Sequence, residues 1–255
     1  MADDVLPTPP LGSSAAESIF AGEGPRSRRA ARNEARLATL LATIAGFVDA
    51  YGIIAYGVFV SFMSGNTTQT GYQAAEGDFG PASASALAIL FFVIGTFAGA
   101  LLAEPAGRSA RRLMFAFVAA TFTGVFGLTQ LGLLATSFGI AIVSFAMGVF
   151  NSALSRVGAQ AVSLTFVTGT LSRVGSHLAL AAKAAPLTDS QGPWDTHVRR
   201  ALMLACIWAG FLAGAILSGA ATPRFGALAL MPAALILAAL AAFDPRDGAA
   251  AGPDN

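Results

Sequence analysis

One carboxylate, Asp49, lies within an apolar stretch of this chain, and Asn151 takes the matching position in a similar stretch 102 residues later. A carboxylate in hydrocarbon costs at least about 2.5–3.5 kcal/mol, so an acid at membrane depth usually holds a proton, a cation or a partner group. We therefore expect Asp49 to be a proton or cation site; the alternative is that it only accepts hydrogen bonds that fix helix packing. Asn151 cannot carry a proton and is expected to bond a neighbouring helix or a solute.

Each apolar stretch is followed by a polar cluster around a glycine, first Ser64-Gly65-Asn66-Thr67 and later Thr168-Gly169-Thr170. Glycine frees the backbone, and hydroxyl and amide side chains compete for its hydrogen bonds, so we expect helices to be broken near Gly65 and Gly169. Such a break is tolerated at membrane depth only inside protein or beside a wet cavity. The clusters are the predicted substrate site, with short re-entrant helices near 67–75 and 170–183. The alternative is a capped loop at the surface.

Two further residues follow the second cluster. Arg173 is a candidate charge partner for Asp49 or for an anionic solute; the alternative, for it and for Arg156, is a charge that only sets topology. His177 lies one helical turn beyond Arg173. No second histidine is close to it in the sequence, and Cys206 is the one cysteine, so we expect no metal site.

Two glycine pairs indicate close helix packing. The eight residues from Gly95, which include Gly99, share five identities with the eight from Gly210, which include Gly214. Small residues four apart let the backbones of membrane helices approach each other, so we expect a packing role for all four glycines.

The composition requires a membrane to surround these residues. Of the 255 residues 55% are hydrophobic and 11% are charged, and the mean hydropathy is +0.66. Soluble domains carry about 25% charged residues. Apolar segments near 20 residues long suffice to cross a bilayer. Six are expected, at 38–60, 83–103, 112–134, 138–154, 198–221 and 225–243.

The positive charges predict the orientation of these segments. Of the 15 Lys and Arg residues, Arg224 alone falls in a connection on the opposite side from the others. Because cytoplasmic connections are enriched in Lys and Arg, we expect both termini in the cytoplasm and the protein in a bacterial inner membrane. Residues 1–33 are expected to be a disordered tail and 245–255 a short tail.

The recurring features predict an all-α fold with an internal repeat. The matching positions are 102, 104 and 115 residues apart, which assigns 34–136 and 137–244 to two three-helix halves. Three crossings are an odd number, so the halves would be inverted relative to each other, an architecture of many secondary transporters. The alternative is a chance likeness between Gly- and Ala-rich helices.

Motifs for other functions are missing from the sequence. It contains no GxxxxGK[ST], HExxH, CxxC or GxSxG pattern. We therefore expect no enzyme activity, no cofactor and no nucleic-acid partner. The expected partners are the lipid bilayer and a small-molecule substrate; the sequence does not specify an oligomeric state.

The two motifs resemble those of the YoaK family of bacterial multi-pass membrane proteins, a domain of unknown function. The resemblance rests on Gly46-Phe47-Val48-Asp49-Ala50 with Ser64-Gly65-Asn66-Thr67, and on Met147–Ala153 with Thr165–Leu171. It covers about residues 38–243. Ser64 stands where Thr is expected, which is a conservative departure. Phe150 stands where Gln often precedes the Asn; this departure removes a polar group and weakens the interpretation that this site recognises a substrate by hydrogen bonds. The resemblance implies a multi-pass inner-membrane protein and no particular substrate.

These features predict a secondary transporter of a small solute, coupled to protons through Asp49, with the Gly65 and Gly169 breaks forming a central site. The alternative is a membrane scaffold or accessory subunit in which Asp49, Asn151 and the glycines only hold helices together. A passive channel ranks last, because the segments at 83–103, 198–221 and 225–243 lack a polar stripe.

Overall fold

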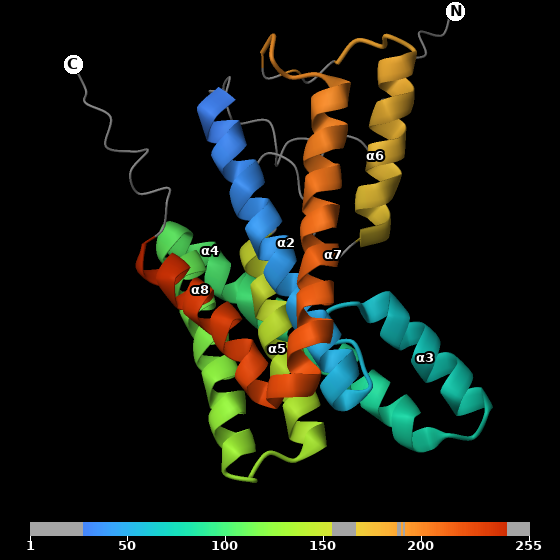
Figure 1. Ribbon diagram of the computed structural model, residues 1–255, viewed down its shortest axis with the longest axis vertical. Coiled ribbons are helices and arrows are strands. Elements are labelled where there is room, and N and C mark those ends of the chain that lie inside the picture. The colour runs from blue at the N-terminus through green and yellow to red at the C-terminus, as the bar shows by residue number, and fades with distance from the viewer. Residues whose placement is uncertain (1–27, 155–166, 188–189, 191, 244–255) are drawn as a thin grey trace, which may run out of the picture.

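The computed structural model describes residues 28–154, 167–187, 190 and 192–243. These residues form helices joined by short connections and contain no strand. The elements are α2 (Arg28–Tyr56), α3 (Met63–Ala75), α4 (Phe79–Gln130), α5 (Thr136–Leu154), α6 (Val167–Ala182), α7 (His197–Phe225), the 3₁₀ helix η1 (Gly226–Leu230) and α8 (Met231–Ala242). The predicted all-α class is confirmed (Figure 1).

Five helical runs among the described residues are long and apolar enough to cross a membrane. They are Ala31–Tyr56, Phe79–Ala103, Ala110–Gln130, Thr136–Ala153 and His197–Ala242. The first four correspond to the first four predicted segments. The last run, of 46 residues, contains both of the remaining ones. The chain is therefore a multi-pass membrane protein.

The run His197–Ala242 is not one straight rod. Figure 1 shows α7 descending and α8 leading back upward beyond it. The reversal begins at Gly226, whose φ of 55° lies in the left-handed region that glycine adopts at low cost. Because α7 ends there and η1 follows, the 225–243 segment is separated from α7 by a turn, as the sequence predicted.

The connection expected between the second and third segments is helical. Arg108, Arg111 and Arg112, predicted to lie between two helices, all belong to α4. A straight helix of 52 residues would measure about 78 Å, more than twice a hydrocarbon core. In Figure 1 α4 instead changes direction, so that its two apolar runs lead away from a bend. Pro105 and Gly107, between those runs, are residues that weaken a helix at such a place.

The start of α2 also differs from the prediction. Residues 28–33 were expected to be part of a disordered tail, yet α2 begins at Arg28. The segment contains arginine and alanine, both strong helix formers, and no proline or glycine, so the helix extends beyond the apolar residues. Residues 1–27 and 244–255, the rest of the predicted tails, lie outside the described residues.

Two helix pairs are packed through glycine. A Cβ atom added to Gly46 on α2 would collide with the carbonyl of Phe211 on α7, and one added to Gly214 would collide with the carbonyl of Thr43. In the second pair, Gly95 on α4 and Gly148 on α5 meet the carbonyls of Phe145 and Phe92 in the same way. Successive glycines meet successive turns of the partner, since Gly210 contacts Thr39 and Gly214 contacts Thr43. Gly95 and Gly99 of α4 likewise meet Phe145 and Val149 of α5, so both pairs are parallel.

The buried core lies where these pairs meet the second half of α4. Its largest fully buried side chains include Leu41 and Val48 of α2, Phe122 of α4, Phe150 of α5 and Leu204 of α7. The helices α3 and α6 lie at the side of this core. In Figure 1 they extend in opposite directions, α3 beside the start of α4 and α6 beside the upper part of α7. Their N-terminal ends are the ends nearest each other in this view.

Candidate functional site

Asp49 accepts three hydrogen bonds from backbone outside a helix. It lies in α2, seven residues before the helix ends at Tyr56, and its side chain is 5% exposed. Its Oδ1 accepts from the N–H groups of Val60 at 3.0 Å, Ser61 at 2.8 Å and Phe62 at 3.2 Å. These N–H groups belong to the segment before α3, which ends at the N-cap residue Phe62, so the carboxylate supplies acceptors that this non-helical backbone lacks.

Asn66 holds the same segment from the opposite direction. Its side chain is fully buried, its Oδ1 accepts from the N–H of Phe59 at 3.0 Å, and its Nδ2 donates to the carbonyl of Phe59. The amide thus replaces both partners that a helix would have given Phe59. Together the Asp49 and Asn66 side chains bind four consecutive residues, 59–62. We call this segment, with its two side chains, the clamped break.

The break lies just before Gly65 and not at the glycine itself. The residues without regular helix are those between Tyr56 and Met63, and Gly65 lies in the first turn of α3. A Cβ at Gly65 would lie 2.5 Å from the ring of Phe62, so this glycine gives space to an aromatic side chain. The break forms at 59–62 because Asp49 and Asn66 supply hydrogen-bond partners there.

The other residues of the first cluster lie within α3. Thr67 is exposed, and its hydroxyl donates to the carbonyl of Met63 at 2.8 Å. Ser64 is also exposed, and its carbonyl accepts from the hydroxyl of Thr68 at 3.1 Å. These side chains return to their own helix, so Asn66 is the member of the cluster that reaches the break.

The second cluster begins α6 as the first begins α3. Thr168, Gly169 and Thr170 follow Val167, the first residue of α6. Each of the two helices has a single buried residue, Asn66 in α3 and Thr170 in α6. Asn151 is half-buried near the end of α5. Residues 155–166, with Arg156, lie outside the described residues, and the break near Gly169 stays a prediction.

Arg173 is exposed on α6. The three hydrogen bonds described for the Asp49 carboxylate come from backbone N–H groups, and Arg173 is not among the donors. The predicted pairing of these two charges is therefore not seen among those bonds. The groups that stabilise the Asp49 carboxylate in these bonds are the backbone N–H groups of residues 60–62.

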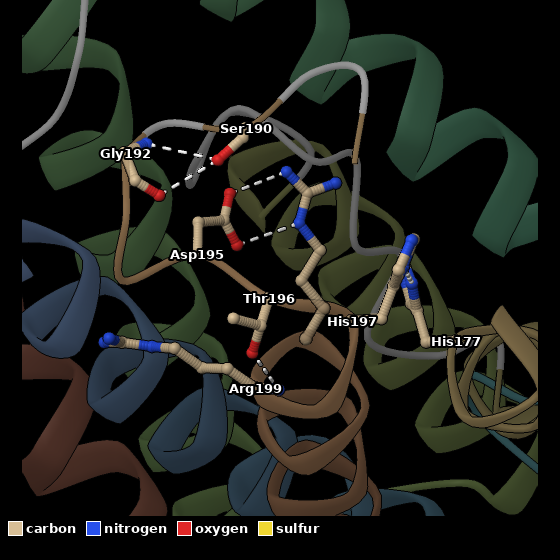
Figure 2. Close-up of polar contacts among 8 residues, drawn as sticks. His177, Ser190, Gly192, Asp195, Thr196, His197 and Arg199 are labelled. Carbon is tan, nitrogen blue, oxygen red and sulfur yellow. Dashed lines mark hydrogen bonds and ion pairs between the residues drawn. The ribbon is translucent and has the colours of Figure 1, made fainter. Parts of the chain in front are cut away.

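The histidines give a further correction. His177 was expected to have no second histidine near it, but α6 and α7 form an antiparallel pair that brings His177 to His197, with their Nδ1 atoms 3.0 Å apart. The described residues contain no group of three or more metal-binding side chains. Figure 2 shows the two imidazoles next to each other at the start of α7.

Comparisons with known proteins agree with a membrane location. The chain is 32% identical over 215 residues to the UPF0700 transmembrane protein RA0705 of Rhizobium meliloti (strain 1021), with 82% of this chain and 87% of the relative covered. No solved structure matches it significantly. The family model described as a protein of unknown function, DUF1275, matches residues 37–243, nearly the extent of the resemblance seen in the sequence. The chain belongs to this DUF1275 family of proteins of unknown function.

Proposed function

We propose that this protein is a secondary transporter of a small solute, in which Asp49 couples transport to protons. The observation that carries the proposal is the clamped break, where one buried carboxylate holds three backbone N–H groups. An ionised carboxylate accepts such bonds strongly, and protonation weakens them. A proton on Asp49 therefore loosens residues 60–62 and the start of α3, and loss of that proton restores them. The break is the element that changes conformation.

The architecture proposed for the transporter is six crossings in two inverted halves, 34–136 and 137–244. The paired glycine contacts support it. Gly46 and Gly148 are 102 positions apart, as are Thr43 and Phe145, while their partners Phe92 and Phe211, and Gly95 and Gly214, are 119 apart. The first residues of α3 and α6 are 104 apart, and so are their buried residues. Three independent features thus relate the halves in the same order.

The solute site in this proposal lies between the N-terminal ends of α3 and α6. Each end carries a glycine cluster, and helix N-termini present N–H groups and a partial positive charge to a ligand. Asn66 and Thr170 are the buried members of the two clusters. Asn151, half-buried near the end of α5, is the uncharged counterpart of Asp49 in the second half. Only the first half then carries a proton.

The cellular setting is part of the same proposal. The bias of Lys and Arg toward alternate connections supports a bacterial inner membrane with both termini in the cytoplasm. The bilayer and the solute are the proposed partners. The proposal includes no enzyme reaction, cofactor or nucleic acid. It also includes the resemblance of the chain to the YoaK family of multi-pass membrane proteins.

The test is proton release from purified protein in weakly buffered detergent, followed with a pH-sensitive dye. Pools of amino acids, carboxylic acids, sugars and nucleosides are added to the wild type, to Asp49→Asn and to Asp78→Asn. Asp78 is the matched control because it is an exposed aspartate whose side chain makes no cap hydrogen bond. We expect one pool to release protons from the wild type and from Asp78→Asn but not from Asp49→Asn.

Two outcomes would contradict the proposal. Equal proton release from Asp49→Asn and the wild type would show that the coupling group lies elsewhere. The second outcome is that no pool releases protons and that Asp49→Asn melts at the wild-type temperature, while Asp49→Leu is destabilised. Leucine leaves three N–H groups without an acceptor, at about 1–3 kcal/mol each. That result would favour the alternative of a membrane scaffold or accessory subunit, because Asp49 would then act only as a hydrogen-bond acceptor that holds the fold together.

A further inference from the structure

The contact between α6 and α7 includes the only two histidines of the chain. His197 is the first residue of α7, placed there by Thr196, whose side chain caps the helix by accepting from the N–H of Arg199 at 3.2 Å. His177 lies five residues before the end of α6. The ring centroids are 5.2 Å apart and the two Nδ1 atoms 3.0 Å apart. The hairpin thus sets two ring nitrogens at hydrogen-bond distance (Figure 2).

The charged groups near this pair are mostly basic. Asp195 accepts from Arg200 through both of its oxygens, at 3.1 and 2.7 Å, and Arg199 stacks 4.5 Å above the ring of Trp194. The one described acid beside the pair is therefore already bound to a cation. The other described charged residues at this end of the neighbouring elements are Arg173 on α6, Lys183 after it, and Arg28, Arg29, Arg32, Glu34 and Arg36 on α2.

A nitrogen–nitrogen contact of this length requires one proton between the rings. In the neutral pair one Nδ1–H donates and the other Nδ1 accepts, and a pair with one extra proton can keep the same bond. A second extra proton places an N–H on both facing nitrogens and two like charges in contact. The Nε2 of His197, a buried atom with no hydrogen-bond partner in the described part of the chain, already carries an N–H once the first extra proton is bound, so the second proton acts at the facing nitrogens alone. The doubly charged pair therefore separates.

A bound metal ion fits these observations less well. With bonds of about 2.0–2.1 Å, two nitrogens 3.0 Å apart subtend an angle near 95° at the metal, narrower than the tetrahedral angle that zinc prefers. Histidine ligands also usually donate their other ring N–H to an acceptor, and the Nε2 of His197 has none among the described residues. The described residues supply no third ligand.

We propose that His177 and His197 form an acid-sensitive latch that fastens α6 to α7 at neutral pH and releases it in acid. The release has a structural consequence because little else buries α6: Thr170 is its single buried residue and lies near the other end of the helix. When the second extra proton binds, the two imidazoliums repel each other and the C-terminal half of α6 moves away from α7. The latch is independent of solute transport and of Asp49.

The experiment measures the separation of α6 and α7 against pH in the full chain. Spin labels are attached to Ser172→Cys and Leu202→Cys, both exposed positions on the two helices, in a Cys206→Ala background with a tag that contains no histidine. We expect one short distance at pH 7.5 and a longer, broader distribution at pH 5. ¹⁵N spectra of the two histidines report their protonation in the same samples.

The control variants separate repulsion from other effects of acid. His177→Gln keeps a hydrogen-bonding side chain but removes one charge, so its distance should not change between pH 7.5 and pH 5. Ser176→Ala, an exposed neighbour on α6, should respond as the wild type does. A widening in His177→Gln equal to that of the wild type would overturn the latch. So would an unchanged distance in the wild type when both imidazoles are charged.

A third result would replace the latch by a metal site. Chelator-treated wild type would then show the long distance even at pH 7.5, and Zn²⁺ or Ni²⁺ would restore the short one. His177→Gln would show no response to either ion. We expect instead that the chelator leaves the short distance unchanged.

Discussion

At the residue scale, the chemistry of the clamped break depends on two side chains that the sequence singles out for different reasons. Asp49 is conspicuous as an acid in an apolar run, and Asn66 belongs to a polar cluster. Both bind the segment 59–62, Asp49 from 11 to 13 residues away and Asn66 from seven residues away at Phe59. Residue types predicted a break and a buried acid. They could not predict which N–H groups the acid would satisfy, because that depends on how the chain folds back.

We expect the buried side chain of Asn66 to be required for the structure of the clamped break. Asn66→Leu keeps a similar volume but leaves the N–H and C=O of Phe59 without their partner, at a cost of about 1–3 kcal/mol for each unpaired group. We expect faster amide hydrogen exchange in residues 59–62, measured by mass spectrometry in detergent. Thr67→Val is the matched control, since it removes a hydroxyl that only returns to Met63 on the same helix. Equal exchange in the two variants would mean that Asn66 does not hold the break.

The histidine pair shows a residue-scale signal that was present in the sequence. His177 and His197 are 20 residues apart, and the connection 183–196 contains proline and glycine, which end helices. A helical hairpin places its two helices side by side, and here it brings His197, the first residue of α7, next to His177, five residues before the end of α6. Sequence separation alone suggested no partner, whereas the hairpin geometry supplies one.

At the element scale, hydropathy located the first four apolar runs, with the second to fourth placed to within four residues at each end, because the bilayer sets the length of apolar helix that is needed. The partner of each glycine was harder to predict. The five identities align Gly95 with Gly210, but the contacts match Gly95 with Gly214, one helical turn further along. A shift of four residues keeps the same helix face and exchanges one small residue for another. Sequence identity therefore cannot separate the two registers, and backbone contact can.

The glycine contacts predict that replacing a contact glycine by alanine lowers the stability of the protein to a similar extent in either half. Gly46→Ala and Gly148→Ala each place a methyl group against a carbonyl of the partner helix, so each helix pair must separate. We expect each variant to lose about 1–3 kcal/mol, seen as a lower melting temperature in detergent. Gly71→Ala is the control, because nothing lies within 4 Å of a Cβ at this position on the exposed face of α3, and alanine favours a helix. A fall for Gly46→Ala alone would contradict the proposed repeat.

At the scale of the whole molecule, the parallel pairs constrain the path of the chain. In six alternating crossings the first and fifth have the same direction, as do the second and fourth. These are the pairs that pack through glycine, α2 with α7 and the first run of α4 with α5. In the proposed path of six crossings, η1 and α8 form the last and shortest one. The five residues of η1 and the 12 of α8 together extend about 28 Å, close to the thickness of a hydrocarbon core.

Six crossings predict on which side of the membrane each connection lies. Single cysteines in a Cys206→Ala background are placed at exposed positions: Glu76, Leu133 and Phe225 in the connections expected outside, and Lys183 and Phe243 at those expected inside. Intact cells are treated with a maleimide that cannot cross the inner membrane. We expect the first three to be labelled and the last two to be labelled only after permeabilisation. The decisive position is Phe243, since a single crossing by His197–Ala242 would bring it outside. Labelling of Phe243 and not Lys183 in intact cells would therefore leave five crossings and remove the basis for two inverted halves.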